Sequence, residues 1–305
     1  MSRAHALAIV AAACAATAAV HGQVFKVAVD GVAVDVLVTR DNRPIPGLTA
    51  PDFRLRDNGV EQRIESVMLE DVPITLLFAL DTSASMKGDQ LDRLKSAARA
   101  AAAALRPVDR VGLLAFNHRV RLLVPPPAEA PALSAHLDTL EADGDTSVFD
   151  ATFAALALRE RAPGRTLVLV FSDGDDTASW LDPRDVLAAA QRSDVVVHAV
   201  VLDASYPADM IALRRLEIAR RLFGEEPHLF GNAYLWHLVQ DTGGALHEAT
   251  SEGLRAAFVR VVNEFHSRYV LTYVPEGVAP RGWHDIEVNV RSQRATVKAR
   301  RGYLR

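Results

Sequence analysis

Residues 74–85 carry the sequence ITLLFALDTSAS. The first seven residues form an uninterrupted apolar run, which is typical of a strand that is covered on both faces of a parallel sheet. Polar residues follow, and apolar residues then recur at the spacing of a helix, at Leu91, Leu94, Ala98, Ala101 and Leu105. The change of period at Asp81 therefore predicts a strand, a loop and a helix in that order.

The alternation of strand and helix patterns continues along the chain. Apolar runs predict further buried strands at Val111 to Phe116, Thr166 to Phe171 and Val195 to Leu202. Helical spacing predicts helices at Val148 to Glu160, Pro183 to Arg192 and Leu254 to His266. This order favours an α/β fold with a doubly wound, mostly parallel sheet and helices on both faces. Ligands of such sheets bind at the carboxyl ends of the strands, so functional residues are expected there.

The two ends of the chain show the period-two pattern of strands instead. Apolar residues alternate at Val32, Val34, Val36 and Val38, and Asn58-Gly59 is a typical hairpin turn. After Phe265 the strand pattern returns, in 269–274, 286–290 and 295–299. Because the last segment is too short for a stable sheet, we expect it to pair with the first. The predicted domains are a β-segment at 23–71, an α/β domain at 72–266 and a second β-segment at 267–305.

The first 22 residues have the pattern of a secretory signal peptide. Arg3 precedes an apolar run from Ala6 to Val20, and small residues follow. The run is too short to be read as a membrane span of about 20 residues. We therefore expect an exported protein, periplasmic or secreted, without a transmembrane span. Acylation of Cys14 is the alternative, although the residues before it lack the usual leucine.

Composition excludes several other classes of protein. The 305 residues include 34 Lys+Arg and 38 Asp+Glu, for a formal net charge of −4, and one cysteine. A slightly acidic chain has no general attraction for nucleic acid, since phosphate binding needs a dense positive surface. A single cysteine excludes a disulfide framework and a cysteine-based zinc site.

Three clusters of oxygen-bearing side chains fall where predicted strands end or helices begin. They are Asp81-Thr82-Ser83-Ala84-Ser85, Gly144-Asp145-Thr146-Ser147 and Ser172-Asp173-Gly174-Asp175-Asp176. Each alone is explained as a helix cap or a solvated turn. In a parallel sheet, however, all three lie at the same edge, and oxygen ligands of this kind suit a hard cation such as Mg²⁺.

These motifs resemble the von Willebrand factor type A family, and in particular its bacterial exported members. The resemblance covers about Val72 to Phe265, and residues 105–111 and 145–151 also look like family sequence. The metal-ion-dependent adhesion site of the family has a D-x-S-x-S motif, a threonine and a later aspartate. In this chain these positions are Asp81, Ser83, Ser85, Thr146 and Asp173.

The resemblance implies a Mg²⁺ ion, with Mn²⁺ or Ca²⁺ as alternatives, held by the two serines. Thr146 would join directly or through water, and the two aspartates would act largely through water. The ion would accept an acidic side chain of a partner protein, so the implied function is adhesion and not catalysis. Further acids, at Asp143, Asp145, Asp175 and Asp176, depart from the family pattern. Side chains that point at the site would strengthen cation capture but oppose an acidic partner, and Asp145, Asp175 and Asp176 are candidates to support the metal ligands. The alternative is that these acids are solvated loop charges. Residues 204–234 form an additional segment.

Two alternatives to binding remain open. The first is a metal-dependent, phosphatase-like hydrolase that uses Asp81, but Ser83 stands where a second acid would donate the proton. The second is a structural component of an envelope assembly with no metal-dependent ligand. Gly-x-Ser-x-Gly, His-Glu-x-x-His and phosphate-loop motifs do not occur. The basic C-terminal stretch is interpreted as the polar face of an edge strand.

Overall fold

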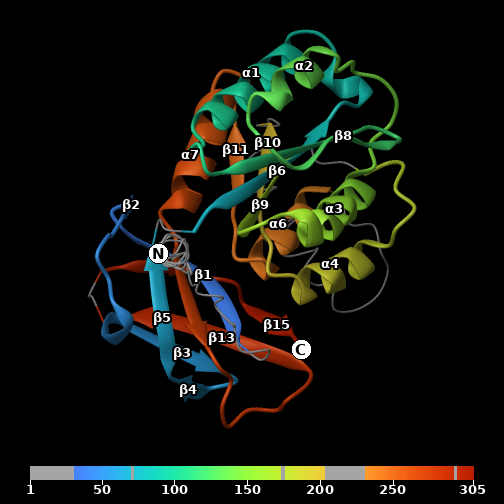
Figure 1. Ribbon diagram of the computed structural model, residues 1–305. Helices are drawn as coiled ribbons and strands as arrows, with labels where there is room; N and C mark the ends of the chain where they lie inside the picture. Colours follow the sequence, from blue (N-terminus) through green and yellow to red (C-terminus); the bar gives the residue numbers. More distant parts are fainter. Residues whose placement is uncertain (1–30, 70–71, 173–175, 203–230, 292–293) are drawn as a thin grey trace, which may run out of the picture. The chain divides into compact units, whose positions relative to one another are not determined.

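The computed structural model describes residues 31–69, 72–172, 176–202, 231–291 and 294–305 (Figure 1). The predicted signal peptide and residues 204–230 of the additional segment lie outside these ranges. The chain divides into two compact units, residues 1–31 and 32–305, and the following description concerns the second.

A six-stranded sheet forms the centre of the α/β part, in the order β11-β10-β9-β6-β7-β8 (Figure 1). All neighbouring strands are parallel except β8, which runs antiparallel to β7 at one edge. The strands are β6 (Ile74–Asp81), β7 (Arg110–Phe116), β8 (Val120–Ala128), β9 (Arg165–Ser172), β10 (Val196–Leu202) and β11 (Leu246–Ala249). The predicted doubly wound α/β fold is confirmed for this part of the chain.

Alternate residues of the central strand β6 contribute to two different cores. Leu76, Phe78 and Leu80 pack with α1, α2 and α7, while Leu77 and Ala79 pack with α3, α4 and α6. Because side chains alternate between the two faces of a strand, an all-apolar strand needs helices on both faces. The helices are α1 (Asp89–Ala103), α2 (Ala132–Asp138), α3 (Val148–Ala157), α4 (Pro183–Arg192), α6 (Gly231–Asp241) and α7 (Leu254–His266). Short 3-10 turns lie at η1 (Ala50–Asp52), η2 (Ala84–Met86) and η3 (Leu158–Arg161).

Strands from the two ends of the chain pair with each other in two further sheets. One has the order β14-β1-β12-β5, with β2 paired to β1, and the other has the order β15-β13-β3-β4. Val34 lies opposite Leu271, and Leu55 lies opposite Val288. The strands are β1 (Val32–Arg40), β2 (Arg43–Pro44), β3 (Phe53–Asp57), β4 (Val60–Gln62), β5 (Ile64–Leu69), β12 (Tyr269–Tyr273), β13 (Trp283–Val290), β14 (Thr296–Lys298) and β15 (Gly302–Leu304).

Local turn chemistry explains which elements were predictable. The hairpin between β3 and β4 turns at Asn58 and Gly59, with φ of 47° and 80°, as the Asn-Gly pair predicts. The helix predicted to reach Glu160 instead ends at Ala157 and tightens into η3. Strands β8, β11 and β15 and helices α2 and α6 were not predicted. β8 contains three consecutive prolines, which are tolerated because it is an edge strand.

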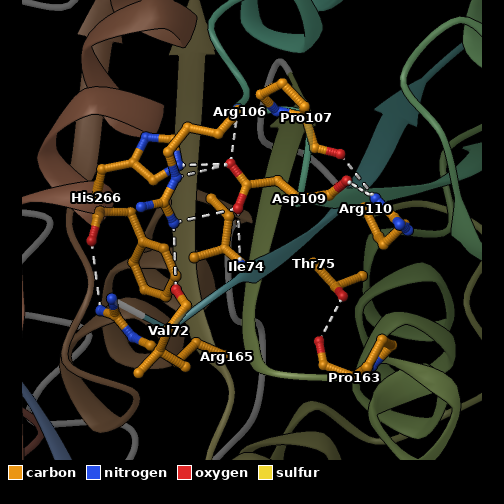
Figure 2. A network of polar contacts seen from close by, with 11 residues as sticks. Val72, Ile74, Thr75, Arg106, Pro107, Asp109, Arg110, Pro163, Arg165 and His266 are labelled. Atoms are coloured by element: carbon orange, nitrogen blue, oxygen red, sulfur yellow. Dashed lines mark hydrogen bonds and ion pairs between the residues drawn. The ribbon is translucent and has the colours of Figure 1, made fainter. Parts of the chain in front are cut away.

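Asp109 links the ends of several elements at the amino edge of the central sheet (Figure 2). Its buried carboxylate accepts hydrogen bonds from the backbone N–H groups of Ile74 (3.0 Å) and Arg106 (2.8 Å), and lies 2.9 Å from Nε2 of His266. The Arg106 guanidinium also donates to the carbonyl of Val72, at 3.2 Å. The start of β6 and the end of α7 are therefore held by one side chain.

Candidate metal and partner-binding site

Asp81 is the last residue of β6, and its side chain is fully buried. Oδ1 accepts a hydrogen bond from the backbone N–H of Ser83 at 2.8 Å, and Oδ2 accepts one from the Ser172 hydroxyl at 2.8 Å. Ser172 ends the neighbouring strand β9. Both carboxylate oxygens are thus oriented by groups at the carboxyl edge of the sheet.

Ser83 and Ser85 bring their hydroxyl groups together directly after this strand. The two Oγ atoms lie 3.0 Å apart, because the chain turns tightly into η2 between them. Ser83 is buried and Ser85 is exposed. The pair therefore connects the buried Asp81 with the solvent-facing surface.

The loop before α3 is hydrogen-bonded to the Asp81–Ser85 segment. The backbone N–H of Ala84 donates to the Gly144 carbonyl (2.8 Å), and that of Asp143 donates to the Thr82 carbonyl (2.9 Å). Gly144 has φ of +75°, and a Cβ at this position would lie 2.2 Å from Nδ1 of His118. Glycine is required here for conformational and steric reasons.

Thr146 exchanges backbone and side-chain hydrogen bonds with the segment that follows β9. Its N–H donates to the Thr177 hydroxyl at 3.0 Å, and its carbonyl accepts from the N–H groups of Thr177 (2.8 Å) and Ala178 (2.9 Å). The Asp176 carboxylate accepts from the N–H of Phe149 at 3.1 Å, at the first turn of α3. Thr146 is buried and fixed at the same sheet edge as Asp81.

Hydrogen bonds join Asp81 to Ser83 and Ser83 to Ser85, and Thr146 follows two positions after Gly144, whose carbonyl accepts from the N–H of Ala84. The fifth predicted metal-site residue, Asp173, and its neighbour Asp175 lie outside the described residues.

The other acids that were predicted near the site have separate surroundings. Asp145 is exposed, and exposed Asp143 lies 4.0 Å from the Lys87 ammonium. The Asp176 carboxylate binds the start of α3 and also accepts from the hydroxyl of Ser179 at 2.6 Å.

Ser172 and Thr177 were not among the predicted site residues, although they hold Asp81 and Thr146 in place. Ser172 stands next to Asp173 in the strand-end cluster, which was the available signal. Thr177 gave no signal, because its partner is 31 positions away in sequence. Across the described ranges, no group of three or more His, Cys, Asp or Glu residues could hold a metal ion.

The fold and this site define a doubly wound α/β module with an oxygen-rich strand edge. Residues 76–175 match the family model described as von Willebrand factor type A domain. The chain thus carries a domain of the von Willebrand factor type A family.

Similar proteins share this domain over part of their length. An inter-alpha-trypsin inhibitor heavy chain of Bos taurus is 25% identical over 174 residues, which are 51% of this chain and 19% of that protein. An uncharacterized protein of Synechocystis is 28% identical over 111 residues, 34% of this chain and 26% of that protein. The chain therefore matches only a minor part of these longer relatives.

Solved structures show the same fold at low identity. The von Willebrand factor type A protein from Catenulispora acidiphila has a TM-score of 0.52 at 13% identity, covering 85% of this chain and 75% of that chain. The corresponding domain of the type V pili tip protein Mfa5 from Porphyromonas gingivalis has a TM-score of 0.50 at 13% identity, covering 68% and 98%. Within the described part of the chain, no helix is long and apolar enough to cross a membrane.

Proposed function

We propose that this protein is an exported binding module whose sheet edge holds Mg²⁺ and, through it, an acidic side chain of a partner protein. Ser83, Ser85 and Thr146 would hold the ion, and Asp81 and Asp173 would support it. The sheets formed by the two chain ends would make up a small β-domain within the same compact unit. No catalytic step is proposed, because Ser83 occupies the position where a general acid would be needed.

The hydroxyl pair carries this proposal. Mg²⁺ binds oxygen ligands at about 2.1 Å in octahedral geometry, so two adjacent ligands are about 3 Å apart. The 3.0 Å between the Oγ atoms of Ser83 and Ser85 fits that spacing. Asp81 is buried behind the pair with both oxygens hydrogen-bonded. These residues therefore suit the hard cation that their chemistry implies.

The nature of these ligands favours an acidic partner. Hydroxyl groups are neutral, so an ion bound through Ser83, Ser85 and Thr146 keeps more of its positive charge than one bound directly by carboxylates. A carboxylate from outside would neutralise that charge at an open position, and bound Mg²⁺ usually retains exchangeable waters. The resemblance in fold to the domain of a pilus tip protein is consistent with a role in adhesion.

Calorimetric titration of the protein with Mg²⁺ tests the proposal. We expect saturable binding by the native protein and none by Asp81→Ala or Thr146→Ala, with Thr146→Ser restoring binding. Asp143→Ala is the matched control, because this exposed carboxylate lies next to the site but is not a proposed ligand. Thermal unfolding would establish that each variant folds. Unchanged Mg²⁺ affinity in both alanine variants would contradict the proposal.

The partner is tested by co-purification from the native envelope with and without a chelator. A protein that is retained only with Mg²⁺, and lost with Thr146→Ala, would support an ion-mediated contact. Retention that is independent of both would contradict it.

A further inference from the structure

The β7–β8 turn, residues 117–119, lies at the same edge of the central sheet as the proposed metal ligands. Phe116, the last residue of β7, is paired with Asp81 in the strand register, and neighbouring strands are about 4.8 Å apart. The turn is closed by Asn117, whose N–H donates to the Arg119 carbonyl at 3.2 Å and whose Oδ1 accepts from the Arg119 N–H at 2.9 Å. The backbone of the turn is therefore held by its own first residue.

Hydrogen bonds also tie this turn to both loops that carry the proposed ligands. On one side, the N–H and the hydroxyl of Thr82 donate to the Phe116 carbonyl, at 2.7 and 2.9 Å. On the other side, Nδ2 of Asn117 donates to the Asp143 carbonyl at 2.8 Å, and the Asn117 carbonyl accepts from the N–H of Ser147 at 2.9 Å. The turn is thus built into the same edge as the proposed metal site.

His118 and Arg119 are the exposed residues of this turn. Within the described part of the chain, neither side chain forms a hydrogen bond or an ion pair. The His118 ring lies against Gly144, where a Cβ would be 2.2 Å from Nδ1. The Gly144 carbonyl in turn accepts from the N–H of Ala84, the residue between the two serines of the site. One residue therefore contacts both the imidazole and the segment that carries the hydroxyl pair.

The charges of the described residues differ around this edge. The loop before α3 carries the exposed acids Asp143 and Asp145, and the Lys87 ammonium lies 4.0 Å from the first of them. The β7–β8 turn instead carries the permanently charged guanidinium of Arg119 and the N–H donor of an imidazole. An acidic segment is repelled by the unpaired carboxylate of Asp145 and attracted by Arg119.

We propose that the β7–β8 turn is a second contact surface for the partner, in which Arg119 and His118 bind a second carboxylate of the segment whose first carboxylate binds the ion. This inference rests on the proposed function. It narrows the partner to a segment with at least two acidic side chains, which leaves the metal site toward β8 and not toward α3. Because exposed ion pairs are weak, the second carboxylate should strengthen binding about fivefold.

Fluorescence anisotropy with labelled glycine-rich peptides tests the inference, in saturating Mg²⁺. One peptide has a single aspartate, and the others have two aspartates separated by two to four residues. The native protein should bind the best of the two-aspartate peptides about fivefold more tightly than the single-aspartate peptide. Arg119→Ala should remove this preference, His118→Ala should reduce it, and Arg119→Lys should retain it because lysine keeps the charge. Arg161→Ala is the matched control, since it removes an exposed arginine at the opposite edge of the sheet.

Calorimetric titration with Mg²⁺ separates this inference from the proposed function. Arg119→Ala should bind Mg²⁺ at least as tightly as the native protein, because the turn supplies no proposed ligand. Equal affinity of the native protein for all peptides, or a preference that persists in Arg119→Ala, would overturn the role of the turn alone. Failure of the native protein to bind Mg²⁺, or of the Mg²⁺-loaded protein to bind any of the peptides, would overturn the proposed function as well.

Discussion

Nε2 of His266 lies 2.9 Å from Oδ2 of Asp109, so the last residue of α7 is bonded to a carboxylate that also receives the N–H at the start of β6 (Figure 2). Burial raises the pKa of Asp109, but the hydrogen bonds from Arg106, Ile74 and His266 outweigh it and hold that pKa below its ordinary value. The carboxylate is therefore charged in the folded protein and satisfied from several elements.

Asp109→Ala should lower the free energy of unfolding by about 3 kcal/mol, because it leaves two backbone donors and part of the Arg106 guanidinium without their buried acceptor. Urea denaturation would measure the loss. Arg121→Ala, at an exposed position of the edge strand β8, should change stability by less than about 0.5 kcal/mol. A loss for Asp109→Ala no greater than this control would refute the linking role of Asp109.

Acid sensitivity is expected from a second buried pair. Nδ1 of His198 lies 2.9 Å from Nε2 of His247. Burial lowers the pKa of both histidines, and the neighbouring cations Arg268 and Lys298 lower them further, although Glu264 raises that of His247. Both rings are therefore neutral in the folded protein near neutral pH, and the N–H group of one ring donates a hydrogen bond to the unprotonated nitrogen of the other.

The sign of the pH dependence follows from these lowered pKa values. The ordinary pKa of histidine is 6.5, and the pKa in the folded protein is lower. As the pH falls below 6.5, the unfolded chain therefore binds protons that the folded chain does not bind, and the free energy of unfolding decreases. Each such histidine contributes at most about 1.4 kcal/mol per pH unit. Thermal unfolding measured across this pH range should show that acidification lowers the stability of His247→Gln less than that of the native protein. His118→Gln, at an exposed histidine, should retain the native profile, and identical profiles for all three proteins would count against the pair.

A buried carboxylate also joins strands from the two ends of the chain. Asp57 on β3 lies 2.8 Å from Nδ1 of His284 on β13, and it accepts from the hydroxyl groups of Tyr273 (2.8 Å) and Tyr303 (3.1 Å). Burial raises the pKa of both tyrosines, that of Tyr303 to about 12, so both keep their protons and donate. Asp57→Ala should lower the free energy of unfolding by about 3 kcal/mol, since it leaves these buried partners without an acceptor.

Tyr303→Phe is the graded comparison for this cluster, because it removes one donor while Asp57 keeps the others. Tyr303→Phe should lower the free energy of unfolding by about 1 kcal/mol. Chemical denaturation followed by circular dichroism would separate the two variants. Equal losses would contradict the role of the Asp57 carboxylate as an acceptor shared by several partners.

Local sequence was sufficient for the elements that set the position of the site. The apolar run that ends at Asp81 is β6, and the predicted helices at 183–192 and 254–266 have the observed bounds. The start of α4 is marked by the Asp182 cap, which accepts from the N–H of Arg184 at 2.8 Å, and by Pro183 in the first turn. Periodicity and capping chemistry are properties of neighbouring residues, so they can be read without a structure.

Contacts between distant segments were beyond such prediction. Strand β11 has only four residues and exists because β10 pairs with it, so its local pattern carried little information. The bonds between Thr146 and Thr177 depend on two loops that the sheet brings together. The sequence predicted that Asp81 and Thr146 lie at one edge of a parallel sheet. The groups that orient them, Ser172 and Thr177, could be identified only from the structure.

Ser172 provides a test of how far those orienting groups matter. Its hydroxyl donates to Oδ2 of Asp81 at 2.8 Å, and it is fully buried at the end of β9. Residues that hydrogen-bond to metal-supporting side chains typically change metal affinity by about tenfold or more when removed. Under the proposed function, Ser172→Ala should therefore weaken Mg²⁺ binding about tenfold in calorimetric titration. Thr166→Ala is the matched control, because Thr166 is buried on the same strand and its hydroxyl has no hydrogen-bond partner among the residues that the structure describes. Mg²⁺ affinity should be unchanged in that variant, and an equal effect of the two substitutions would mean that general loosening of β9, and not the bond to Asp81, controls the site.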